Sequence, residues 1–340
     1  MTKILVGIPV FNGARYLRDC LASIIASKLD EGVNLQVVVV DDASTDETSK
    51  IVLGEFPKVK LLHHNVNLGV TKSNNELLFE ASEFDYFVRA DVDTIFDPEA
   101  LSELIKFLQE HQEAGLVSAR IVNTAGEDST SCFKYFQSPI HWFKEYNFLL
   151  TKIWRLHCCF SHPESQAKDL AVSDSSPAVG GVRMTVRRVK ALASTAIMAR
   201  VTAVSKVGLF DENLPFFLED SDWAKRFWDS GFEVYVNPKA VVTHIGGSSN
   251  ELIYIMCREQ SLTSLYRFTD KHFPGIGNRW LLLTSVLGGT LINLVVATLL
   301  LPLTLSSTKV RQIVFKNHRS FRGVLKWHLQ HLRLFLNYRV

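Results

Sequence analysis

Cysteine is scarce in this sequence, and the cysteines present are not spaced for cross-linking. The 340 residues include five of them, with no C-x-x-C pair. An odd number in this arrangement argues against a disulfide framework and is typical of a reducing compartment. Charged residues make up 21% and hydrophobic residues 47%, a balance that excludes a disordered chain and indicates a globular protein. We expect no signal peptide, because the opening MTKILVGIPVF runs directly into a strand-like segment.

Acidic residues are missing from the C-terminal end. Residues 306–340 contain eight Lys or Arg and no Asp or Glu, whereas residues 1–305 contain 29 basic and 35 acidic residues. A basic tail on a mildly acidic body indicates an anionic partner, either nucleic acid or lipid. The preceding segment, Trp280 to Leu305, carries no charge over 26 positions, and as a helix it would be about 39 Å long. A buried core helix is the alternative, but soluble helices rarely stay apolar on every face. We therefore expect residues 280–340 to contact membrane lipid and not nucleic acid.

The topology of this apolar segment stays open at the level of sequence. Basic residues flank it on both sides, and a single span would put the basic tail outside. Gly288-Gly289 and Pro302 permit a re-entrant hairpin instead, and we favour a hairpin or an in-plane anchor. The tail segment FRGVLKWHLQHLRLFL mixes apolar and basic side chains, as an interfacial helix does.

Strand-like and helix-like segments alternate in the body of the chain. Apolar runs predict strands at residues 4–10, 35–40, 59–64, 84–90 and 115–122, and periodicity predicts helices at 17–25, 71–83 and 98–111. Strands that are apolar throughout are typical of a mostly parallel α/β sheet with helices on both faces, whose ligands bind beyond the carboxyl ends of the strands. Periodicity fades after residue 125 and returns near 190. We predict a nucleotide-binding half at 1–125, a second half at 126–275, and a membrane-associating region of hydrophobic and amphipathic helices at 276–340.

Two aspartates end the run VVVVDD, where valines cannot solvate them. Ser44 and Glu47 fit a capping box for the next helix, but that does not account for Asp41 and Asp42 together. A carboxylate here can accept hydrogen bonds from a nucleobase N–H or a ribose hydroxyl.

A second acidic stretch, FVRADVDTIFD, ends another predicted strand. Asp91 and Asp93 lie one residue apart and repel each other unless a cation joins them. Few carboxylates completed by phosphate and water are typical of Mg²⁺, and Mn²⁺ accepts the same ligands. The alternative is a solvated turn. Asp97-Pro98 predicts an N-cap with proline at the first helical position.

Other polar residues have both a structural and a functional interpretation. Asn67 and Gly69 fit a turn and a cap. The acids of FLEDSDW suit the first turn of a helix that begins near Glu219. His244 ends the strand AVVTH, where a lone histidine is more often structural than a ligand.

The order of these blocks is more informative than any one of them. IPVFNGARYLRDCLASI, VVVVDDASTDET, NLGVTKSNN, RADVD, VGLFDENLPFFLEDSDWAKRFWDSGF and PKAVVTH together resemble glycosyltransferase family 2 from Lys3 to Ile245. The resemblance implies a GT-A fold and an inverting transferase. It also implies a dTDP-, UDP- or GDP-linked sugar donor and Mg²⁺ or Mn²⁺ as cofactor.

The resemblance also implies a role for each site residue. Asp42, with Asp41 as the alternative, would face the base, Asp91 would lie near ribose and diphosphate, and His244 would approach the metal or the diphosphate. The full implied set is Pro9, Asn12, Asp41, Asp42, Asn67, Gly69, Lys72 and Asp91 for the nucleotide sugar, Asp93 and His244 for the metal, Asp220 as general base, and Glu219, Asp222 and Arg258 on the acceptor side. The chemistry agrees, because inversion needs a base at the acceptor hydroxyl and, elsewhere, a cation at the leaving diphosphate.

The C-terminal layout resembles bacterial rhamnosyltransferase-like members of the family, which build O-antigen or capsule glycans on lipid carriers. It implies a possible rhamnose donor, a glycan or lipid-linked acceptor, and a place at the cytoplasmic face of the bacterial inner membrane. Glu259 stands where the family usually has Asn after the arginine that Arg258 matches, and the QxxRW signature is absent, which predicts no polymerisation.

Two other functions remain as alternatives. A polyprenyl-phosphate sugar transferase would make a lipid-phosphate sugar in place of a glycosidic bond. A catalytically silent sugar-nucleotide-binding subunit is the other, and the intact set of Asp93, Asp220 and His244 argues against it. A nucleotide-sugar pyrophosphorylase would need a Gly-rich phosphate loop, which VGIPVFNG is not.

Overall fold

The computed structural model describes residues 1–128, 132–133, 136, 138–140, 142, 185–245, 259–300 and 322–331. The chain splits into two compact units. The first comprises Met1–Phe136, Glu164–Glu212 and Glu219–Gly247, and the second Gln137–Pro163, Asn213–Leu218 and Ser248–Val340. The Arg258 position predicted on the acceptor side lies outside the described residues.

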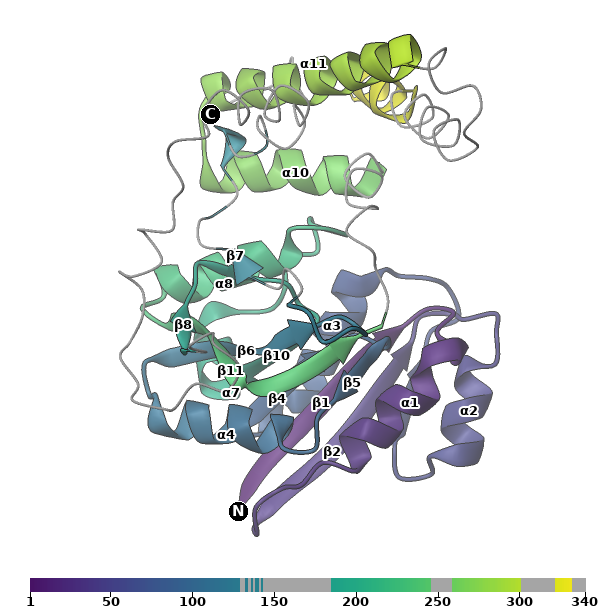
Figure 1. Cartoon of the computed structure of the whole chain (residues 1–340), viewed down its shortest axis with the longest axis vertical. Coiled ribbons are helices and arrows are strands. Elements are labelled where there is room, and N and C mark those ends of the chain that lie inside the picture. The colour runs from purple at the N-terminus through teal and green to yellow at the C-terminus, as the bar shows by residue number, and fades with distance from the viewer. Residues whose placement is uncertain are drawn as a thin grey trace. The chain divides into compact units, whose positions relative to one another are not determined.

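A nine-stranded sheet forms the centre of the first unit (Figure 1). Its main path runs β3-β2-β1-β4-β10-β6-β11-β5, and β8 pairs with β11. The strands are β1 Thr2–Val10, β2 Val33–Asp41, β3 Lys60–His63, β4 Tyr86–Ala90, β5 Thr94–Phe96, β6 Ala114–Val122, β8 Arg187–Arg188, β10 Ala196–Arg200 and β11 Glu233–His244. Two short strands, β7 Cys132–Phe133 and β9 Ala191–Leu192, pair separately. All five predicted strands of the N-terminal part are present.

The strands of the sheet run in both directions. The β3-β2-β1-β4 part is parallel, as the apolar runs predict, and β11 pairs parallel to β6. Between these parts, β10 runs antiparallel to both β4 and β6. Because β10 is antiparallel, the residues just before it lie beside the residue just after β4, and the Asp91 amide donates to the Thr195 carbonyl at 2.9 Å. The reversed strand therefore brings a second segment to the carboxyl end of β4.

Helices cover both faces of this sheet. Alternate residues of the strands point to opposite faces, so Ile4 and Val6 join one hydrophobic cluster while Leu5 joins the other. Helices α1, α2 and α4 contribute to the first cluster, and α3, α7 and α8 to the second. Their bounds are α1 Ala14–Ile25, α2 Thr48–Glu55, α3 Val70–Glu80, α4 Ala100–Glu110, α7 Val201–Val207 and α8 Glu219–Asp229. The predicted α/β class with helices on both faces is confirmed.

Two predicted helix caps are wrong. Helix α4 begins at Ala100, and the Asp97 carbonyl accepts from the Ala100 amide as a turn, with no side-chain cap bond. Helix α2 begins at Thr48, and Ser44 instead accepts a hydrogen bond from the Asn12 amide. In both cases the predicted cap residue makes a tertiary contact: Ser44 with the Asn12 amide, and Asp97 through its own amide, which donates to the Val241 carbonyl.

The second unit contains α10 Glu259–His272 and α11 Ile276–Leu300, and residues 322–330 are also helical. Arg279 ties the two helices together through a two-point ion pair with Asp270, at 2.7 and 2.5 Å. Helix α11 continues through Gly288 and Gly289, so a hairpin turn at these glycines is wrong. Among the described residues, we find no helix with the length and apolar character needed to cross a membrane.

Candidate active site

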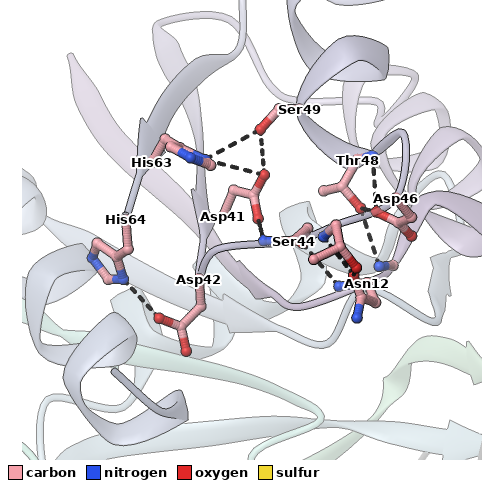
Figure 2. Close-up of polar contacts among 11 residues, drawn as sticks. Asn12, Asp41, Asp42, Ser44, Asp46, Thr48, Ser49, His63 and His64 are labelled. Atoms are coloured by element: carbon pink, nitrogen blue, oxygen red, sulfur yellow. Dashed lines mark hydrogen bonds and ion pairs between the residues drawn. The ribbon is translucent and has the colours of Figure 1, made fainter. Parts of the chain in front are cut away.

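Polar side chains gather where β1 and β2 end, and they hold two loops together (Figure 2). Asn12, which follows β1 with a φ of 54°, donates its amide to Ser44 Oγ at 2.8 Å and accepts from the Thr45 amide at 2.8 Å. Asp46 accepts from the Ala14 amide at 3.0 Å. Pro9 lies in β1 opposite Val40. The residues predicted to border the nucleotide thus form one braced loop pair at the carboxyl edge of the sheet.

Asp41 is fully buried and is satisfied within the protein. It accepts from the Ser44 amide at 2.9 Å and from the Ser49 hydroxyl, and His63 lies 3.4 Å away. Burial alone would raise the pKa of Asp41, but the hydrogen bonds from Ser44 and Ser49 outweigh it and lower that pKa. The carboxylate therefore stays charged and fixes the turn after β2.

Asp42 holds the loop that leads into α3. Its carboxylate accepts from the Leu68 and Gly69 amides at 2.7 and 2.8 Å and bonds His64 Nδ1 at 2.8 Å. Gly69 has a φ of 91°, a conformation that favours glycine. A carboxylate has about four acceptor sites, so three internal bonds leave room for about one external donor. Asn67 and Lys72, from the same loop and helix, are exposed.

His64 is a site residue that the sequence reasoning missed. Its Nε2 bonds Glu76 Oε2 at 2.6 Å, so the ring bridges Asp42 and Glu76 while its side chain is only 12% exposed. Burial lowers the pKa of His64, but the hydrogen bonds to Asp42 and Glu76 outweigh it and raise that pKa. The available signal was the polar pair His63-His64 at the end of a predicted strand.

Three potential metal ligands meet beyond β4. One ligand atom from each of Asp91, Asp93 and His244 lies within 4.8 Å of the others. The two aspartates occupy the turn between β4 and β5, and His244 ends β11, which pairs with β5 opposite Thr94. His244 Nε2 lies 3.2 Å from Asp93 Oδ1. Burial would raise the pKa of Asp93, but His244 lowers it, and the Asp93 hydrogen bond raises the pKa of His244.

The donor set fits a divalent cation. Two carboxylates and one imidazole, all partly exposed, are ligands that Mn²⁺ accepts, and oxygen-rich sets also suit Mg²⁺. Their mutual spacing permits one ion to contact all three. The predicted pair of Asp93 and His244 is thus brought together, with Asp91 as a third member of the cluster.

A separate acidic pair begins α8. Asp220 accepts from the Ser194 amide at 3.1 Å and from its neighbour Ser221 at 2.6 Å, and it keeps partial exposure. Burial raises the pKa of the Asp220 carboxyl. Glu219 is 7% exposed, its Oε2 has no hydrogen-bond partner among the described residues, and burial together with Asp220 raises its pKa. Raised pKa values in a partly open site are typical of proton-transfer groups.

Asp222, the third acid of this stretch, has a structural contact. Its side chain is fully buried and bonds Arg226 Nε at 2.9 Å. Arg226 in turn donates to the Val207 and Leu209 carbonyls. Asp222 therefore helps to fasten α8 to the segment that follows α7.

The fold and the site together define a class of protein. The mixed α/β sheet with helices on both faces matches the fold of solved GT-A-type glycosyltransferases. Residues 5–164 match the family model described as "Glycosyl transferase family 2".

Relatives with known names agree with this assignment. Over 129 residues the chain is 28% identical to the poly(ribitol-phosphate) beta-N-acetylglucosaminyltransferase TarS of Staphylococcus aureus, covering 37% of this chain and 22% of TarS. The chain thus spans about a fifth of the length of this curated relative. These findings show a likeness to family 2 glycosyltransferases over the N-terminal part of the chain.

Solved structures share the fold. A mannosyltransferase from Pyrobaculum calidifontis, in complex with GDP-Man and Mn²⁺, has a TM-score of 0.52 and 16% identity, covering 95% of this chain and 86% of its own. GalNAc-T7 with UDP, GalNAc and Mn²⁺ has a TM-score of 0.53 and 14% identity, covering 73% of this chain and 45% of its own. A fragment of S. aureus TarS has a TM-score of 0.50 and 18% identity, covering 97% of this chain and 92% of its own.

We predict that His64 makes stability depend on pH. Because its pKa is raised in the folded protein, its stabilisation is complete below the ordinary value of 6.5 and is lost as pH rises through the folded value. His64→Asn should therefore lower the free energy of unfolding by about 1.5–3 kcal/mol at pH 5.5, and by less at pH 8.5. Urea unfolding across this range measures the difference. His63→Asn is the control, since that side chain is 47% exposed; an equal loss at both pH values for His64→Asn contradicts the prediction.

Proposed function

We propose that the chain is an inverting glycosyltransferase that moves a sugar from a nucleotide-diphosphate sugar to a hydroxyl of a glycan or lipid-linked acceptor. One observation carries the proposal: a metal-type cluster and a partly exposed carboxyl with a raised pKa lie at the same edge of one sheet, linked through the segment before β10. Inversion needs these two functions on different groups.

The donor lies along the loops that end β1, β2 and β3. The braced Asn12 loop borders the nucleotide, and exposed Asn67 and Lys72 are available to it. Asp42 offers its remaining acceptor site to the base, while Asp41 supports the turn. The donor is dTDP-, UDP- or GDP-linked, and rhamnose is one of the sugars it can carry. Neighbours that bind UDP and GDP-Man support a nucleotide sugar.

The diphosphate lies at the Asp91 cluster. Asp93 and His244 would hold Mg²⁺ or Mn²⁺, with Asp91 beside them. When bound, the cation offsets the negative charge that builds up on the leaving diphosphate. The protein supplies the fixed ligand positions, because the β5–β11 pairing holds His244 over the turn that carries Asp93.

Asp220 serves as the general base. It takes the proton of the acceptor hydroxyl, whose oxygen bonds to the anomeric carbon as the bond from that carbon to the diphosphate oxygen breaks. A hydroxyl is a poor nucleophile without such a base. The raised pKa suits the task, since a base works best when its pKa approaches the working pH.

Contact with a membrane surface is the second part of the proposal. Four exposed apolar residues of α11 are Ile276 (61% exposed), Trp280 (58%), Leu291 (48%) and Val295 (47%). At 3.6 residues per turn they fall within a sector about 100° wide, whereas Leu282 and Val286 are buried. An apolar stripe followed along the chain by a basic tail suits an anionic lipid surface. A lipid-linked acceptor would be met there, and we propose the cytoplasmic face of a bacterial plasma membrane as the location.

Asp220→Asn should lower kcat by about 10²–10⁴-fold, the usual contribution of a general base, while donor affinity stays unchanged. Steady-state transfer and calorimetric binding of UDP with Mn²⁺ measure the two effects. Asp229→Asn on the exposed side of the same helix is the matched control. Undiminished transfer by Asp220→Asn would refute the base. It would favour a polyprenyl-phosphate acceptor, because a phosphate is already anionic.

Asp93→Asn should abolish the part of donor binding that depends on metal, because the cluster loses a charged ligand. We expect the Mn²⁺-dependent gain in UDP affinity to fall by more than about tenfold. Calorimetry with and without Mn²⁺ measures it. Asp97→Asn, an exposed acid shortly after the same turn, is the control; equal metal dependence in both variants speaks against the site.

Wild-type protein should co-sediment with vesicles of phosphatidylglycerol and phosphatidylcholine, and less so at high salt. Trp280→Ser with Leu291→Ser should weaken binding about tenfold or more, since two apolar side chains no longer enter the interface. Leu53→Ser is the control because Leu53 is 70% exposed on α2. Failure of the wild type to bind, or unchanged binding by the double variant, removes the lipid contact from the proposal.

A further inference from the structure

Arg89 is a buried cation that the proposed reaction leaves without a task. It lies in β4, one residue from the end of the strand, and is 4% exposed. Burying a guanidinium is costly unless opposite charge or hydrogen-bond acceptors meet it. Its flanking residues Val88 and Ala90 are fully buried and apolar. The acceptors must therefore come from other segments.

A single nitrogen of Arg89 makes two contacts. Nη1 lies 2.7 Å from Asp91 Oδ1 in the candidate metal cluster. The same nitrogen donates to the Ser194 carbonyl. Ser194 is within reach because antiparallel β10 pairs with β4, with Ala196 opposite Ala90 and Ile197 opposite Arg89. The Nε of Arg89 has no hydrogen-bond partner among the described residues, and both contacts described above use Nη1.

Ser194 carries the connection onward to the other acid cluster. Its amide donates to Asp220 Oδ2 at 3.1 Å, so the residue is held by Arg89 at its carbonyl and holds Asp220 at its amide. The neighbouring Thr195 carbonyl accepts from the Asp91 amide at 2.9 Å. Both Ser194 and Thr195 are at most 9% exposed, so water offers little alternative. Three contacts therefore connect Asp91 to Asp220. Asp91 forms an ion pair with Arg89, Arg89 donates to the Ser194 carbonyl, and the Ser194 amide donates to Asp220.

The charge of Arg89 acts on the same acids. Burial raises the pKa of Asp220 and of Glu219, and the Arg89 guanidinium opposes that rise at both carboxyls. The effect adds to the two amide hydrogen bonds that Asp220 receives. Without the cation, less of Asp220 would be in the deprotonated form that accepts a proton.

We infer that Arg89 is a positioning residue that couples the donor and metal side of the site to the general base by fixing Asp91 and, through Ser194, Asp220. The inference rests on the proposed function, because Asp220 is taken as the base. Arg89 is 4% exposed and acts through Asp91 and Ser194. Its contribution is to keep the base at a fixed distance from the cluster and in its charged form.

The test compares Arg89→Gln, Arg89→Lys and the control Arg200→Gln in the full chain. Arg200 is another arginine that donates to backbone carbonyls, here those of Leu108 and His111. These contacts involve neither acid cluster. For Arg89→Gln we expect a lower kcat and an acid limb of the kcat–pH profile that moves up by about 1 unit or more. Arg89→Lys keeps a positive charge near the position of Nη1, so its acid limb should lie close to that of the wild type. Arg200→Gln should lower stability and leave the limb in place.

A second readout does not need activity. Amide hydrogen exchange of residues 191–196, read by mass spectrometry, should accelerate in Arg89→Gln and not in Arg200→Gln, because Ser194 loses its anchor. An unshifted acid limb with active wild type, or unchanged exchange at 191–196, overturns the inference. If the wild type transfers none of the dTDP-, UDP- or GDP-linked sugars, the proposed function fails and the coupling to a base fails with it, while the exchange result still reports whether Arg89 holds Ser194.

Discussion

The pairing of β10 with β4 in the antiparallel sense is the contact on which the site depends. Parallel strands bring the loops that follow them to one carboxyl edge of a sheet. The reversed strand adds the segment before β10, and its carbonyls take the Asp91 amide and the Arg89 guanidinium. The same segment offers the Ser194 amide to Asp220. Because β10 is antiparallel, Asp91 after β4 and Asp220 in α8 both bond to the backbone segment before β10.

Hydrogen-bond donors sort the acids of this edge into two groups. Asp41 has enough donors to outweigh burial, and its pKa is lowered. Asp42 accepts hydrogen bonds from two amides and bonds a histidine. Glu219 and Asp220 have too few donors for their burial, and their pKa values are raised. The first group braces loops, and the raised pKa values of the second are typical of groups that exchange protons. Asp93 lies between these cases, since a histidine holds it charged where a cation fits equally.

Much of the fold follows from the sequence because apolar runs mark buried strands directly. The five N-terminal strands were predictable in this way, and the acids of FLEDSDW marked the first turn of the helix that begins at Glu219. Strand direction was not predictable, since alternation and apolar content read the same from either end. The caps at Ser44 and Asp97 failed for a related reason: a local pattern cannot show that Asn12 claims Ser44. Likewise, an uncharged run says nothing of its neighbours, and α11 passes through Gly288-Gly289 as one helix.

The site residues likewise fall into those that the sequence indicated and those that it did not. Asp93, His244 and Asp220 could be singled out because each ends or begins an element in a recognisable block, and the chain order of the blocks carried the resemblance. Arg89 and His64 could not, although each bridges two acids or an acid and a carbonyl. Yet the sequence held one usable sign for Arg89. A cation inside FVRA, among residues that must be buried, requires acceptors from elsewhere in the fold. A cation beside Asp91 in a buried strand therefore indicates that a distant segment supplies an acceptor at this strand end, as Ser194 does.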